Sequence, residues 1–76
     1  MHVDLWSHTG KKSRVIAVIR SEEGKVSIEE KERMPASYRN EIMKTRERVT
    51  GDDEAFLRQL TVEFSGSYIK AHFLAD

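Results

Sequence analysis

The residues best suited to metal chemistry lie near the two ends of the chain. His2 and Asp4 are two residues apart, so a strand would place both on one face. His72 and His8 would share that face if the last strand lay beside the first. Two or three imidazoles and a carboxylate can bind zinc or another borderline metal. Because a His-x-Asp pair often occurs by chance, exposed polar residues are the simpler interpretation, and we predict no metal site and no cofactor.

No motif in the sequence predicts catalysis. Serine, histidine and aspartate are present, but none of the serines lies in a nucleophile elbow, and there is no glycine-rich phosphate loop. A chain of 76 residues also has difficulty enclosing the ~300 Å³ or more that small-molecule pockets occupy. We therefore expect a non-catalytic binding protein rather than an enzyme.

Length and charge restrict the class of protein further. The chain is expected to form a single small domain over residues 1–76. Its 13 Lys and Arg balance 13 Asp and Glu, which excludes a uniformly basic nucleic-acid binder and an acidic tail. The charges are nevertheless segregated, because residues 10–20 carry four basic side chains and no acidic one, whereas 22–32 and 52–63 each sum to −3. A local basic patch is therefore compatible with zero net charge.

The absence of cysteine favours a reducing compartment, so we expect a cytoplasmic location. The longest apolar run, Val15–Ile19, is far shorter than the ~20 residues of a membrane-spanning helix, and we expect no membrane partner. A domain of this size has a small core, and a dimer interface is one way to bury more apolar surface.

Hydrophobic periodicity predicts four strands and two helices. Apolar and polar residues alternate over 2–8, and five consecutive apolar residues flanked by arginines occupy 14–20. Alternation resumes at Val26 and continues into the charged run 29–33. Pro35 marks the change to helical spacing, which predicts helices over 36–49 and 53–64 with Gly51 between them. Alternation over 68–74 predicts the last strand.

Residues 60–64 are open to two interpretations. Leu60-Thr-Val-Glu-Phe64 alternates and precedes Ser65-Gly66-Ser67, a pattern that also fits a strand entering a hairpin. A strand there would leave only ~7 residues for the second helix, which is short for a globular helix. We therefore favour a helix in this segment.

Together these elements predict an α+β two-layer domain with topology β-β-β-α-α-β. Chain direction allows the last strand to pair antiparallel with the first or the third strand. The third strand is rich in charge, as edge strands often are. The expected antiparallel sheet therefore has order 4-1-2-3, with both helices on one face.

This arrangement leaves the other face of the sheet without a cover. Simple alternation places Val15 and Ala17 toward the helices, and Ile16 and Val18 on the opposite side. An exposed apolar patch usually marks an interaction site, and Trp and Tyr are enriched at interface hot spots. We expect self-association or docking of a protein partner, unless a loop or the tail covers this face or Trp6 packs along Arg and Lys stems. The predicted partner-binding residues are Trp6, Ile16, Val18, Tyr68 and Leu74.

Nucleic-acid binding through the same face is the second hypothesis. Aromatic side chains on an open sheet can stack on bases while Arg and Lys contact phosphates. No recognised nucleic-acid-binding motif is present, so the support is compositional. The predicted contacts are Arg14, Arg20 and Lys70 on the face, with Lys11 and Lys12 in the adjoining turn.

Overall fold

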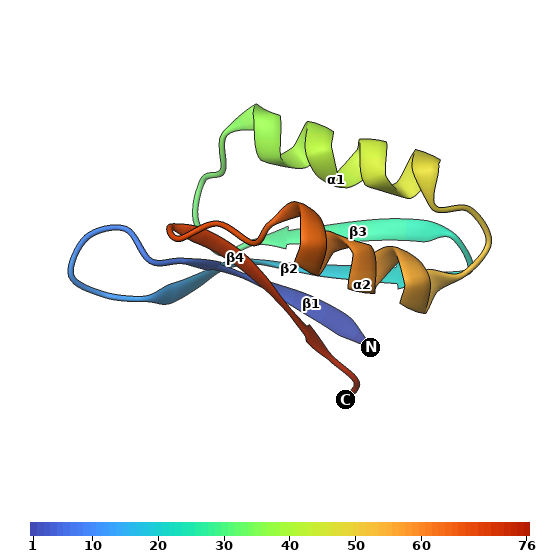
Figure 1. The fold of residues 1–76 in the computed structure, drawn as a ribbon, viewed down its shortest axis with the longest axis horizontal. Coiled ribbons are helices and arrows are strands. Elements are labelled where there is room, and N and C mark those ends of the chain that lie inside the picture. Colours follow the sequence, from blue (N-terminus) through green and yellow to red (C-terminus); the bar gives the residue numbers. More distant parts are fainter.

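The computed structural model describes residues 1–76, which form one antiparallel sheet and two helices. The sheet order is β3-β2-β1-β4, and both helices lie on the same side of it (Figure 1). This confirms the predicted α+β fold, including its strand order. No helix is long and apolar enough to cross a membrane. The elements are β1 (His2–Ser7), β2 (Arg14–Glu22), β3 (Lys25–Glu30), α1 (Ala36–Arg48), α2 (Asp53–Glu63) and β4 (Ile69–Leu74).

The second helix runs through the segment that had two interpretations. α2 continues to Glu63, so residues 60–63 are helical as favoured. Its N-terminus is fixed by Asp52, whose carboxylate accepts hydrogen bonds from the amides of Glu54 and Ala55 at 2.9 and 3.3 Å. Helical spacing places Phe56, Leu57 and Leu60 on one buried face, which packs over β1, β2 and β4.

β2 contains a β-bulge that changes which side chains face the core. Leu5 pairs with Ala17, but the next residue of β1, Trp6, pairs with Val15, so Ile16 has no partner on β1. Because cross-strand partners share a face, Val15 lies on the side of Trp6. Ile16 is only 6% exposed and belongs to the hydrophobic core. The predicted orientations of Val15 and Ile16 are therefore wrong.

Both outer strands of the sheet, β3 and β4, have features that oppose pairing with another strand. β3 carries charged residues along its length, and the chain after it closes over the bulge, because the amides of Lys31 and Glu32 donate to the Ile16 carbonyl at 2.8 and 3.2 Å. The first half of β4 is covered by the segment leaving α2. There the Ala71 amide donates to the Phe64 carbonyl at 2.8 Å, and the Gly66 amide donates to the Ile69 carbonyl at 3.1 Å. The first half of β4 therefore has few free backbone groups, whereas the outer edge of β3 is protected only by its charged side chains.

Candidate interaction face of the sheet

The face of the sheet away from the helices is organised around Trp6. Register places Trp6 opposite Lys70 and Asp4 opposite His72, so side chains of β1 and β4 share this face. The Trp6 ring is stacked with the His8 ring at 6.1 Å between centroids and 8° between planes. The His72 ring meets Trp6 edge-on, also at 6.1 Å. Two imidazoles, one directly after β1 and one on β4, therefore pack against the half-buried indole.

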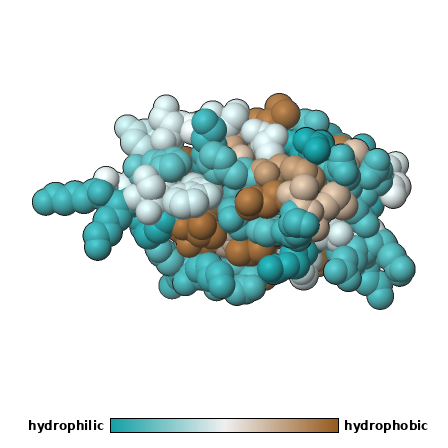
Figure 2. All heavy atoms as spheres, turned by 90° about the horizontal axis from the view of Figure 1, so that it is seen from below, coloured by the Kyte–Doolittle hydropathy of each residue, from teal (hydrophilic) through white to brown (hydrophobic).

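A shallow hollow of about 370 Å³ lies at this cluster and is open to solvent. Figure 2 views the molecule from this side and shows apolar side chains in the middle of the face, surrounded by hydrophilic ones. Because it is shallow and open to solvent, this hollow suits one or two side chains of a partner better than a ligand that must be enclosed. It is lined by Asp4, Trp6, His8, His72 and Leu74.

The structure brings only part of the predicted apolar patch together. Trp6 and Leu74 both line the hollow, and Leu74 is 39% exposed. Val18 lies in register between Asp4 and Glu29 but is only 8% exposed, and Ile16 is in the core. Tyr68, just before β4, is 67% exposed and does not line the hollow. The accessible patch is smaller than expected and is concentrated at Trp6.

The histidine and aspartate residues considered for a metal site have other partners. His2 Nε2 lies 3.3 Å from an Asp4 carboxylate oxygen, and His2 Nδ1 lies 2.6 Å from Asp76 Oδ1. Asp76 Oδ2 in turn contacts the Met1 ammonium at 2.8 Å, and this ammonium lowers the pKa of the Asp76 carboxyl. No three His, Cys, Asp or Glu side chains are arranged to hold a metal ion. These groups instead tie the start of β1 to the segment after β4.

The five basic residues predicted to contact nucleic acid fall into two groups. Arg14 pairs with Glu32, and its register with the buried Ser7 places it on the other side of the sheet from Trp6. Arg20 lies 3.5 Å from a Glu29 carboxylate oxygen. The remaining three, Lys11, Lys12 and Lys70, are exposed and form no ion pair. Two of the five predicted cations are thus already neutralised.

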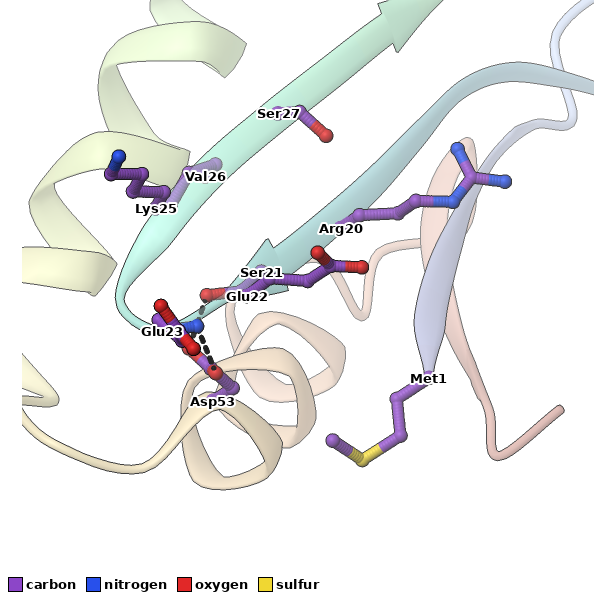
Figure 3. A pocket seen from close by; sticks show the side chains of 9 residues that line it. All are labelled: Met1, Arg20, Ser21, Glu22, Glu23, Lys25, Val26, Ser27 and Asp53. Atoms are coloured by element: carbon purple, nitrogen blue, oxygen red, sulfur yellow. Dashed lines mark hydrogen bonds between the residues drawn. The ribbon is translucent and has the colours of Figure 1, made fainter.

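A second hollow, of about 770 Å³, lies at the β2–β3 hairpin and was not predicted (Figure 3). Glu23 and Gly24 form its turn with φ of 51° and 82°, as a type I′ turn requires. Asp53, in the first turn of α2, accepts hydrogen bonds from the Glu23 and Gly24 amides at 2.8 and 3.0 Å and from the Ser21 hydroxyl at 2.6 Å. A glycine at this position is typical of a tight hairpin turn, but nothing in the sequence links the turn to Asp53. The polar groups of this hollow serve the fold.

Asp53→Asn is expected to make the protein less stable at neutral pH and less sensitive to acid. The Ser21 hydroxyl, followed by the turn amides, lowers the pKa of Asp53 below the ordinary value of 3.8. Stabilisation by this carboxylate is therefore complete above pH 3.8 and is lost as the pH falls through the lowered pKa. Urea unfolding at pH 7 and pH 3 measures both effects. Glu22→Gln is the control, because Glu22 lies in the same hairpin but outside this network; an equal response in both variants would contradict the assignment.

Trp6 and its two imidazoles thus form a preorganised cluster in an open hollow. The exposed Lys70 lies next to Trp6 in register, and no metal-binding group of side chains accompanies the cluster. The function must be argued from this geometry alone. Comparison of the chain with models of protein families, with curated proteins and with solved structures gives no match.

Proposed function

We propose that the protein is a small non-catalytic binding module that self-associates through the sheet face around Trp6. The observation that carries this proposal is the position of Trp6, half-buried in an open hollow beside the exposed Leu74. A rigid aromatic anchor beside a hollow is the usual centre of an interface, because it adds large contact area at little cost in conformational entropy. The absence of cysteine supports action in the cytoplasm.

A second copy of the chain is the occupant that the charges favour. Two copies do not repel each other overall, because each has 13 basic and 13 acidic side chains. On the face itself, Asp4 carries a negative charge, and Lys70, which is opposite Trp6, carries a positive one. A two-fold axis repeats every contact, so Lys70 of one copy can face Asp4 of the other on both sides of the interface. The face is therefore complementary to itself in charge.

Domain size gives an independent reason for association. A domain of ~60 residues buries only about 60% of the surface of its unfolded chain, so small single cores are marginal. Stacking two sheets face to face, at about 10 Å, forms a second apolar layer. This layer would contain Trp6 and Leu74 of both copies, with Val15 beside them on the same face.

Trp6→Ala is expected to weaken the dimer at least ~30-fold, since truncating a hot-spot side chain costs about 2 kcal/mol or more. Light scattering coupled to gel filtration, over a range from low to high micromolar protein, measures the dissociation constant. Val62→Ala is the matched control, because Val62 is 62% exposed but lies on α2 in the other layer. A monomer at every concentration, or equal weakening by both variants, would exclude this function.

Nucleic-acid binding is the second candidate, and one observation favours it. Lys11, Lys12 and Lys70 are exposed without acidic partners, and Lys70 is next to Trp6 in register. Three neutralised phosphates predict a log–log salt slope of about −2 for a single strand. Titration with single- and double-stranded oligonucleotides at two salt concentrations measures this slope. No binding at low salt excludes the candidate, because phosphate contacts are strongest there.

A further inference from the structure

We infer that association through the Trp6 face is controlled by pH, with His8 and His72 as the residues that sense it. This inference rests on the proposed self-association and adds its regulation. Histidine changes charge between pH 5 and 8, and only a small shift in environment is needed to place the change within the physiological range. The chain has three histidines, and all three lie on β1, directly after it or on β4, around the same face.

His8 and His72 are placed where a partner must touch them. Both line the hollow, and both ring centroids lie 6.1 Å from the Trp6 ring. A second copy seated on Trp6 therefore lies against both imidazoles. Across a two-fold axis, four of these rings meet in one interface. Like charges brought together there are costly, because the interface excludes water and lowers the local dielectric.

The surrounding charges do not compensate for protonation of these two rings. Asp4 is opposite His72 but is already shared with His2, and Lys70 beside Trp6 is itself positive. The remaining charged groups of the face are engaged with one another: Arg20 with Glu29, and the Met1 ammonium and His2 with Asp76. With both imidazoles neutral, the charges of the face nearly balance. With both imidazoles protonated, the face gains two positive charges per copy and four per dimer.

Protonation can occur without disrupting the fold. His8 Nδ1 lies 2.7 Å from the Ser13 hydroxyl, which accepts a hydrogen bond as readily as it donates one, so this contact survives either state of the ring. The carboxylates of Asp53 and Asp76 have pKa values lowered from 3.8, and both stay ionised at pH 5.5. Mild acid therefore acts on the interface and leaves the domain folded.

The test is sedimentation analysis of the intact chain at pH 8.0, 6.5 and 5.5 at constant ionic strength. The dissociation constant of the wild-type dimer is expected to rise at least tenfold from pH 8.0 to 5.5. In His8→Gln/His72→Gln it should change less than twofold, whereas Val62→Ala, on α2 in the other layer, should keep the full response. Each single variant, His8→Gln and His72→Gln, should show an intermediate response, which keeps the comparison usable if the double variant associates poorly. Circular dichroism at each pH confirms that the chain remains folded.

The outcomes separate this inference from the function beneath it. A monomer at pH 8.0 overturns the proposed self-association, and the pH inference falls with it. A dimer of equal affinity at pH 8.0 and 5.5 overturns only the pH inference, as does a full response in both single variants. Fluorescence of Trp6, the only tryptophan in the chain, adds a second signal. Because protonation of a neighbouring imidazole changes indole emission directly, only the part of the pH response that depends on protein concentration reports dimer dissociation.

Discussion

Ile16→Asp is expected to unfold the protein, whereas Val15→Asp, one position earlier, is expected to leave it folded. The β-bulge places Ile16 in the hydrophobic core and Val15 on the open face beside Trp6. Ile16 is 6% exposed, so an aspartate there would bury a carboxylate without a partner. Burying an unpaired charge in this way costs upward of ~4 kcal/mol, in addition to the lost apolar burial.

The expected loss is large compared with the stability available. A native domain typically has about 0.05–0.15 kcal/mol per residue, which amounts to roughly 4–11 kcal/mol for 76 residues. Val15→Asp should cost under about 1 kcal/mol, because the new carboxylate reaches water on the open face. Thermal and urea unfolding of the two variants measure the difference. Similar stability of the two variants would contradict the bulge. A larger loss of stability in Val15→Asp than in Ile16→Asp would instead support simple alternation through β2.

Phe56→Ala is the second variant with a large expected effect, a loss of about 3–5 kcal/mol. Phe56 is fully buried on the face of α2 that packs on the sheet. Its ring also lies under the Arg46 guanidinium of α1, with 5.3 Å between the guanidinium carbon and the ring centroid. Truncation therefore leaves a cavity and removes an apolar contact between the two helices. Urea unfolding at pH 7 measures the loss, which should lower the midpoint without abolishing cooperativity.

Phe56→Leu separates the two contributions. Leucine fills most of the cavity but offers no aromatic face, so its additional cost over simple repacking should be the cation–π part, about 0.5–1 kcal/mol. Arg46→Met in both backgrounds completes a double-mutant cycle. A coupling energy near zero would show that the guanidinium packs on Phe56 only as an apolar stem. A cost for Phe56→Leu as large as for Phe56→Ala would contradict the cavity explanation.

The fold could be predicted because each element has a strong local signal. Alternation in residues 2–8 and 68–74 set the faces of β1 and β4, and helical spacing of Phe56, Leu57 and Leu60 outweighed the alternation at 60–64. The charged residues of β3 correctly placed it at an edge. These signals depend on neighbours in the sequence, which is why one chain was enough to read them.

The bulge could not be predicted for a physical reason. Val15–Ile19 is apolar at all five positions, so the pattern contains no information about which residues face the helices. The orientation is set by pairing with β1, where Trp6 skips Ile16, and by the amides that close on the Ile16 carbonyl. Register is a property of the assembled sheet. For the same reason the predicted side of the sheet agrees with the structure for Trp6 but not for Ile16.

The sequence could predict the ion-pair partner of one basic residue, Arg20, but not that of Arg14. The two-residue turn at Glu23 and Gly24 fixes the register of β2 and β3, and so brings Arg20 near Glu29. The pairing of Arg14 with Glu32 was not accessible, because it depends on the bulge that moves Arg14 off the Trp6 face. Strand order and alternation together predicted that His8 and His72 share one face of the sheet, but not that both rings pack against Trp6.

The protection of both sheet edges against strand pairing limits the size of any assembly. The Phe64–Gly66 segment covers the first half of β4, and the charged side chains of β3 oppose strand addition at the other edge. Growth of a continuous sheet from molecule to molecule, the route to filaments, therefore has no adequate starting point. Contact through the single open face uses up that face in each molecule. Assembly by this protein should consequently stop at a pair, even at high concentration, instead of polymerising.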